Sequence, residues 1–242
     1  MARSLTLSLL LLVLVVQVQA QRGRNNLGID LGYQVSYFNP RPYNFAIDSL
    51  YNTLQGDLIQ PLSSVKWPQG LSGGISLYRG RTNYRLGAVV FSSRSHALRT
   101  DAAGVVQRRD VSFAGTTISL GLTSELIPIG DLGAFCVGAT FNSTNLVTAT
   151  AEVPDSAYDA DAALEVTSNQ WKPGFLIHAP FRLKIGEQVR LAAEPYYQVF
   201  FTPGDFTGFS QQINGATARD GRLKGDIDHL GFNFSLTVLV RR

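Results

Sequence analysis

Hydrophobic and polar residues alternate with a period of two through most of the chain. In residues 27–37 every odd position is apolar and every even position is small or polar, and residues 230–238 repeat the pattern with the opposite parity. This is the period of a β-strand that buries one face. The alternation predicts eight strands, at residues 27–38, 71–79, 84–94, 111–126, 132–141, 171–183, 189–201 and 230–240.

The connections between these strands alternate between short and long. Short turns are expected at 80–83, 128–131 and 185–188, and longer connections at 39–69, about 95–110, 142–170 and 203–224. In an antiparallel up-and-down barrel whose termini lie on one side, the short turns all lie on that side and the long loops on the other. The sequence therefore predicts an all-β fold, an eight-stranded antiparallel up-and-down barrel.

One face of the predicted strands is polar, and the other is apolar and rich in aromatic residues. The polar face includes Asp30, Arg182 and Glu194, and ionised groups are favourable only where water or counter-charges meet them. The aromatic residues of the other face fall mostly near strand ends, as in the interfacial girdles of membrane barrels. We expect the polar face inside and the apolar face toward lipid, which makes the barrel transmembrane. The alternative is a soluble exported barrel with an apolar lumen that binds a hydrophobic ligand.

The first twenty residues have the pattern of a secretory signal peptide. One charge at Arg3 precedes an apolar run over residues 5–16, and Val18-Gln19-Ala20 resembles a cleavage site. We expect residues 1–20 to be removed and residues 21–242 to form one barrel domain. The mature chain has no run of 18 apolar residues that could span a membrane as a helix, so any crossing would use strands.

Charge and cysteine content narrow the partners. The chain has 21 basic and 18 acidic residues without a basic cluster, which argues against nucleic acid as a partner. The single cysteine, Cys136, cannot form an internal disulfide and is expected to be a small buried or lipid-facing hydrophobe.

Charged residues of the polar face gather near the predicted short turns. Counting along the strands places three acids and three bases at that end of the lumen, Asp30, Arg85, Glu125, Arg182, Arg190 and Glu194. A balanced set in a narrow barrel predicts a paired network that plugs the lumen, because unpaired charges there are costly. The alternative is a gate or an ion path.

The sequence offers little for catalysis. His178 and His229 both face the predicted lumen but stand roughly 20 Å apart along the strands, and His96 falls in an outer loop without a placed carboxylate partner. No metal-ligand spacing, phosphate loop or nucleophile elbow occurs. We predict no catalytic residue, cofactor or metal site, with a lipid-modifying enzyme or protease as the alternative, because such sites assemble from distant residues.

The long connections carry three local signals. Residues 44–55 predict a short amphipathic helix in the first loop, with Asn44 as its N-cap and one apolar face formed by Ile47, Leu50, Tyr51 and Leu54. We expect it to pack over the barrel mouth; docking on a partner or on lipid headgroups is the alternative. The second connection predicts a basic two-stranded ribbon, either simply solubilising or in contact with anionic lipopolysaccharide, with Arg94, Arg99, Arg108 and Arg109. The third, between residues 143 and 170, is acidic and contains no base.

The chain resembles the outer-membrane β-barrel proteins of Gram-negative bacteria, and more narrowly the small porin-family or PorT-like barrels. The resemblance rests on the signal peptide, the eight-strand layout, the segment Ala193-Glu194-Pro195-Tyr196-Tyr197-Gln198 and the helical insert in the first loop. The chain departs from better-known members in ending Val240-Arg241-Arg242, where a terminal Phe is usual.

The resemblance implies a location in the outer membrane and a structural, adhesive or narrow-channel, porin-like function without enzymatic activity. The implied partners are outer-membrane lipid and lipopolysaccharide, the barrel-assembly machinery, and small solutes or ions. It names no specific protein partner.

Overall fold

The computed structural model describes residues 25–159, 164–215 and 220–240. The predicted signal peptide lies outside the described residues, as do residues 160–163 of the acidic third connection. Within the described part of the chain, no helix is long and apolar enough to cross a membrane.

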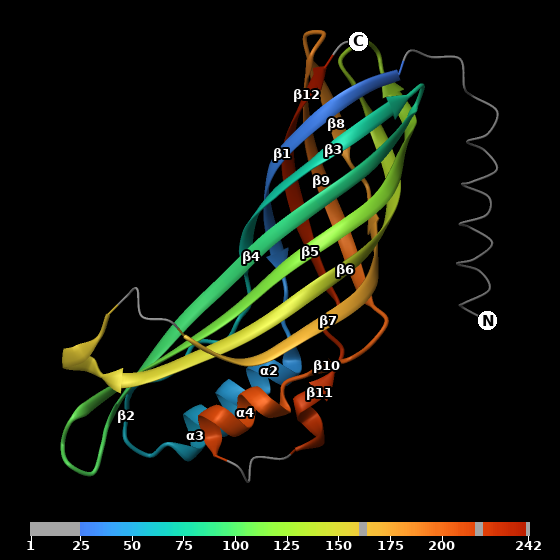
Figure 1. The fold of residues 1–242 in the computed structure, drawn as a ribbon. Helices are drawn as coiled ribbons and strands as arrows, with labels where there is room; N and C mark the ends of the chain where they lie inside the picture. Colours follow the sequence, from blue (N-terminus) through green and yellow to red (C-terminus); the bar gives the residue numbers. More distant parts are fainter. Residues whose placement is uncertain (1–24, 160–163, 216–219, 241–242) are drawn as a thin grey trace.

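Antiparallel strands close into a ring (Figure 1), because β12 pairs with β1 on one side and with β9 on the other. Strands β7 and β8 occupy one position in the ring and are separated only by Ala179 and Pro180. If each strand position of the barrel wall is called a stave, the ring has eight staves. The prediction of an eight-stranded antiparallel up-and-down barrel is therefore confirmed. In ring order from β1 the strands are β1 (Asn25–Tyr37), β3 (Gln69–Arg79), β4 (Thr82–Thr100), β5 (Val106–Ile129), β6 (Gly133–Pro154), β7 (Glu165–His178) with β8 (Phe181–Ile185), β9 (Val189–Phe200) and β12 (His229–Val240).

The rim of the barrel is uneven. Strands β4, β5 and β6 have 19, 24 and 22 residues, whereas β1, β9 and β12 on the opposite side have 13, 12 and 12. The wall formed by β4–β6 therefore continues far beyond the short strands (Figure 1). This confirms the ribbon predicted around residues 95–110, whose tight turn is closed by Asp101 and Val105. The expected loop at 142–170 is wrong, because β6 and β7 remain paired up to Thr150 and Glu165.

Side chains of the staves alternate between the lumen and the outer wall. In β12 every second residue from His229 is buried, and the residues between them are exposed. Outward-facing Leu31 and Leu71 are 64 % and 71 % exposed, whereas Asp30 in the lumen is 3 % exposed. The predicted assignment of faces, polar inside and apolar outside, is confirmed.

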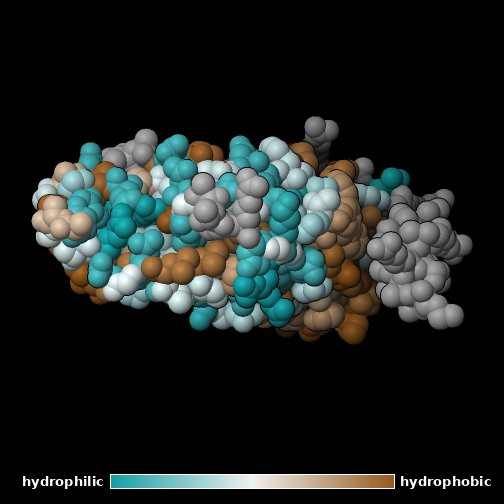
Figure 2. Space-filling model, turned by 90° about the horizontal axis from the view of Figure 1, so that it is seen from below, coloured by the Kyte–Doolittle hydropathy of each residue, from teal (hydrophilic) through white to brown (hydrophobic). Residues whose placement is uncertain are grey.

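A helical cap covers the mouth on the side of the long connections. It consists of α2 (Arg41–Phe45), the π-helix η1 (Ala46–Tyr51), α3 (Asn52–Leu54) and α4 (Thr207–Asn214), with the short strands β2 (Leu58–Gln60), β10 (Gly204–Asp205) and β11 (Lys224–Gly225) and the 3-10 turn η3 (Gly221–Leu223). The 3-10 turn η2 (Asp155–Ala157) follows β6 at the end of the overhanging wall and contacts β5. The helices lie beneath the overhanging wall of β4–β6 (Figure 1). Seen from the cap end, the surface is largely hydrophilic, with hydrophobic residues gathered where the barrel wall shows (Figure 2).

Candidate functional site

Arg85 lies between two buried carboxylates in the lumen. Its Nε atom is 3.4 Å from Oδ2 of Asp30, and its Nη1 atom is 3.4 Å from Oε2 of Glu194. The Asp30 carboxylate also accepts hydrogen bonds from the hydroxyls of Ser76 and Thr237. Each of these five residues comes from a different stave, so the network ties β1, β3, β4, β9 and β12 together across the lumen.

His178 is a partner of this network that the sequence analysis did not assign. Its Nδ1 atom is 2.5 Å from Oε1 of Glu194. Its Nε2 atom is buried without a hydrogen-bond partner among the described residues, and the residue lines a cavity of about 50 Å³. The alternation placed His178 on the lumen face, but only the register of β7 against β9, which sets His178 opposite Tyr196, brings it beside Glu194.

The remaining residues of the predicted cluster do not form ion pairs with it. Arg190 lies over the ring of Tyr78 at 4.3 Å from its centroid, and Arg182 lies 5.7 Å from the same centroid. Both arginines border a cavity of about 20 Å³ together with the carboxylates of Asp30 and Glu194. Glu125 does not border it and has no ion-pair partner among the described residues; it lies opposite Cys136 in the β5–β6 pairing.

Two small cavities lie within the lumen. The cavity of about 50 Å³ is lined by polar side chains that include Gln34, His178 and Gln198, and the cavity of about 20 Å³ lies around Asp30 and Arg190. Arg85 and Glu194 border both cavities. Their ion pair therefore stands between two spaces that hold at most a few water molecules.

The cap seals the outer end of the lumen with aromatic side chains. The ring of Phe113 lies 5.4 Å from that of Phe38 and 5.0 Å from that of Tyr43, and Tyr43 stacks on Phe209 at 4.5 Å. These residues belong to a buried cluster of 18 hydrophobic residues that joins the barrel wall to the first and last outer loops. Burial raises the pKa of the Tyr43 hydroxyl above its ordinary value, so the ring stays neutral.

The predicted first-loop helix packs over the barrel mouth, with two differences. The helix begins at Arg41, and Asn44 lies within it and bonds the backbone of Val65 instead of acting as the N-cap. Ile47 and Tyr51 are buried and Leu50 is partly buried against the cluster, but Leu54 is 64 % exposed. The π-helical turn explains this difference, because its wider i→i+5 turn rotates the residues that follow out of the predicted face.

Arg109 anchors the cap to the overhanging wall. Its guanidinium pairs with the carboxylate of Glu152, which also pairs with Arg99 at 2.6 Å. The Arg109 guanidinium donates to the backbone carbonyls of Gln212 and Ile213 at the C-terminal end of α4. A cation there stabilises the helix, because the unpaired carbonyls carry partial negative charge. The arginines predicted to form an exposed basic ribbon are thus partly used inside the cap.

The opposite end of α4 carries a carboxylate. Oδ1 of Asp205 accepts a hydrogen bond from the backbone N–H of Thr207, and Oδ2 is 2.8 Å from the ammonium of Lys224. Partial burial raises the pKa of Asp205, but the hydrogen bonds from Lys224 and Thr207 outweigh it and leave the pKa below its ordinary value. The two ends of α4 are therefore held by charges of the sign that the helix dipole favours.

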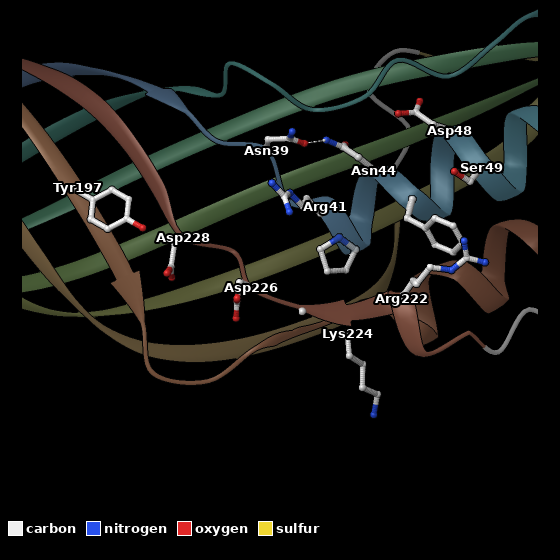
Figure 3. Close-up of a pocket in the computed structure, with 13 residues that line it drawn as sticks. Asn39, Arg41, Asn44, Asp48, Ser49, Tyr197, Arg222, Lys224, Asp226 and Asp228 are labelled. Atoms are coloured by element: carbon white, nitrogen blue, oxygen red, sulfur yellow. Dashed lines mark hydrogen bonds between the residues drawn. The ribbon is translucent and has the colours of Figure 1, made fainter. Parts of the chain in front are cut away.

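A polar groove of about 730 Å³ lies on the side of the rim formed by the short strands β1, β9 and β12. It runs between the first-loop helix and the segment 222–228 (Figure 3). Arg41, Arg222 and Lys224 contribute bases, and Asp48, Asp226 and Asp228 contribute acids. Arg222 pairs with Asp220 and Lys224 with Asp205, two residues that do not line the groove. Arg41 is exposed and has no ion-pair or hydrogen-bond partner among the described residues.

Comparisons with known proteins give similarity of fold only. No protein-family description matches the sequence, and no curated protein matches it. Among solved structures, Ail, the attachment invasion locus protein of Yersinia pestis in complex with the heparin analogue sucrose octasulfate, aligns over 90 % of this chain and 100 % of its own, with a TM-score of 0.40 and 8 % identity. Neisserial surface protein A aligns over 88 % of this chain and 95 % of its own, with a TM-score of 0.38 and 8 % identity.

Proposed function

We propose that this protein is a closed outer-membrane barrel that holds a folded binding platform at the surface of a Gram-negative cell. In this proposal it has a structural or adhesive function, and it neither catalyses a reaction nor conducts ions at the level of a porin. The observation that carries the proposal is the closure of the lumen by two successive barriers, the Arg85 network and the aromatic cap.

The outer wall supports a location in the membrane. Its apolar residues form a continuous surface around the staves, with Leu120 63 % and Phe234 53 % exposed. Soluble monomers rarely expose apolar patches larger than a few hundred Å², whereas lipid covers such a wall at no cost. The polar lumen disfavours the alternative of a soluble barrel, since a hydrophobic ligand needs an apolar interior.

The size of the lumen cavities supports a protein without enzymatic activity. The Glu194–His178 pair is the arrangement closest to a catalytic base, because the carboxylate orients the imidazole. It faces a cavity of about 50 Å³, far smaller than the several hundred Å³ of ordinary ligand sites. The same barriers argue against a wide pore.

A narrow channel is the second candidate, and one observation favours it. Both lumen cavities are polar and meet at the Arg85–Glu194 pair, so displacement of this pair would join them. Planar bilayers that contain the refolded full chain test this candidate. We expect no steady conductance; steady conductance at porin-like levels would overturn the closed-barrel proposal and leave a channel.

Labelling of single cysteines on intact cells tests the location and the orientation. Val105→Cys lies at the tip of the overhanging ribbon, Asp131→Cys lies in a short turn at the other end, and native Cys136 is 0 % exposed and should stay unlabelled. We expect an impermeant maleimide to label Val105→Cys on intact cells and Asp131→Cys only after the envelope is permeabilised. The reverse pattern would refute the orientation, and recovery of the protein in the osmotic-shock fraction would refute the location.

A further inference from the structure

We propose that the groove between the first-loop helix and segment 222–228 binds the headgroup of a phosphorylated glycolipid of the surrounding outer leaflet. This inference rests on the proposed outer-membrane location. It adds a ligand class and names the residues that would hold it, with Arg41 as the principal phosphate contact.

The position of the groove points to a membrane lipid. Tyr37 and Leu230 are the last outward-facing residues of β1 and β12, and Leu230 lies opposite Tyr197 of β9. Tyr197 also lines the groove, and Figure 3 shows it at one end, with Asp226 and Asp228 between it and the helix. Tyrosines at this level of a barrel lie at the boundary between acyl chains and headgroups. The groove therefore opens where a lipid headgroup would lie.

The chemistry of the lining suits a sugar that carries phosphate. A guanidinium is the preferred partner of phosphate oxygens. Of the basic residues that line the groove, Arg41 is the one that forms no ion pair with an acidic residue of the described chain. Carboxylates and amides accept hydrogen bonds from hydroxyl groups, and Asp226, Asp228 and Asn39 provide these acceptors. A lipid whose headgroup carries phosphate but few hydroxyl groups, such as phosphatidylglycerol, would satisfy fewer of these acceptors. The volume of about 730 Å³ lies within the range of small-molecule sites.

The walls of the groove are held in place before any ligand arrives. Asn44 donates to the side chain of Asn39 at 2.7 Å and to the carbonyl of Val65 at 2.8 Å, and these bonds fix the turn that carries Arg41. On the other wall, the Arg222 guanidinium lies 4.1 Å from the centre of the Phe45 ring. The carboxylate of Asp228 accepts a hydrogen bond from the backbone N–H of Phe200 at 2.8 Å. Binding would therefore require little ordering of the protein, which favours affinity.

Native mass spectrometry of the full chain in phosphatidylcholine nanodiscs tests the site. The probes are a bis-phosphorylated diglucosamine lipid, its dephosphorylated form, phosphatidylglycerol, and the soluble phosphorylated disaccharide without acyl chains. We expect adducts with the first probe, and an occupancy about tenfold lower for the Arg41→Ala variant, the size of effect typical for the loss of a charge-assisted hydrogen bond. Arg81→Ala, which removes an exposed arginine from a short turn at the other end, should bind like the parent.

Each result decides for or against the site. Equal binding by Arg41→Ala and Arg81→Ala, equal binding of the dephosphorylated lipid, or stronger binding of phosphatidylglycerol would overturn the inference. Binding of the soluble disaccharide as tight as that of the lipid would also overturn it, and would identify a site for free phosphorylated sugars. Failure of the parent to insert into nanodiscs would instead refute the proposed membrane location, so the two failures are distinguishable.

Discussion

Arg85 should be the most important single charge in the lumen for stability. It is the only described arginine in contact with both Asp30 and Glu194, and the Arg85→Ala substitution would leave two buried carboxylates without a cation between them. Breaking a buried ion pair typically costs about 3–5 kcal/mol. We expect a value near 3 kcal/mol, because Asp30 keeps its bonds from Ser76 and Thr237 and Glu194 keeps His178.

Arg190→Ala is the matched comparison, because it removes the same charge from the same lumen. Arg190 contacts the Tyr78 ring instead of an acid, so its removal should cost only about 1–2 kcal/mol, the range of a cation–π contact. Unfolding by guanidinium in detergent micelles, followed by the fluorescence of Trp67 and Trp171, measures both variants against the parent. Equal unfolding midpoints, or a lower midpoint for Arg190→Ala, would show that the Arg85 contacts do not organise the lumen.

Three further predictions follow from the cap, the outer wall and α4. Phe113→Ala should lower the free energy of unfolding of the cap by about 3–5 kcal/mol, measured by hydrogen exchange of α4 amides, because Phe113 is fully buried among aromatic rings. Phe234→Arg should reduce folding yield in vesicles, at a cost of about 2–4 kcal/mol, while Ser235→Ala should fold like the parent. Because the pKa of Asp205 is lowered in the folded protein, its ionised carboxylate stabilises α4 at pH values above the unfolded pKa, and this stabilisation is lost as the pH falls through the folded pKa. Asp205→Asn should therefore remove the acid-induced increase in hydrogen exchange of the α4 amides. An unchanged increase in the variant would assign the effect to another group.

The strands and the two faces of the barrel could be predicted because they depend on local alternation. Residues that face lipid are apolar and residues that face the lumen are polar, so the two kinds alternate along each strand of the barrel. The contrast is lost at residues 142–145 of β6 and at residues 167–170 of β7, because all the residues of both runs are polar. Because neither run has an apolar outer face, the sequence of this extension looks like a loop.

The helix α4 could not be predicted for a different reason. Its eight residues include Gly208, Ser210 and Asn214, which are poor helix formers, and helices this short are marginal in isolation. It is held by tertiary contacts instead, with Asp205 at its first turn, Arg109 at its last and Phe209 buried in the cap. Likewise, the position of Arg85 between two acids follows from how the staves meet in space, which strand-by-strand counting gives only approximately.

Most of the four arginines of the ribbon form ion pairs within the protein, so we expect contact with anionic lipid at the groove instead of at the ribbon. Arg99 and Arg109 pair with Glu152, and Arg108 pairs with Asp110 and lies 3.7 Å from the centre of the Tyr158 ring. Among the described residues of the ribbon, only Arg94 remains exposed without an ion pair. The ribbon is also on the side of the rim formed by the long strands β4–β6, which carry it away from the apolar wall (Figure 1). Lipid phosphate would reach a cation more readily beside the short strands β1, β9 and β12, because these strands end close to the apolar wall that faces lipid.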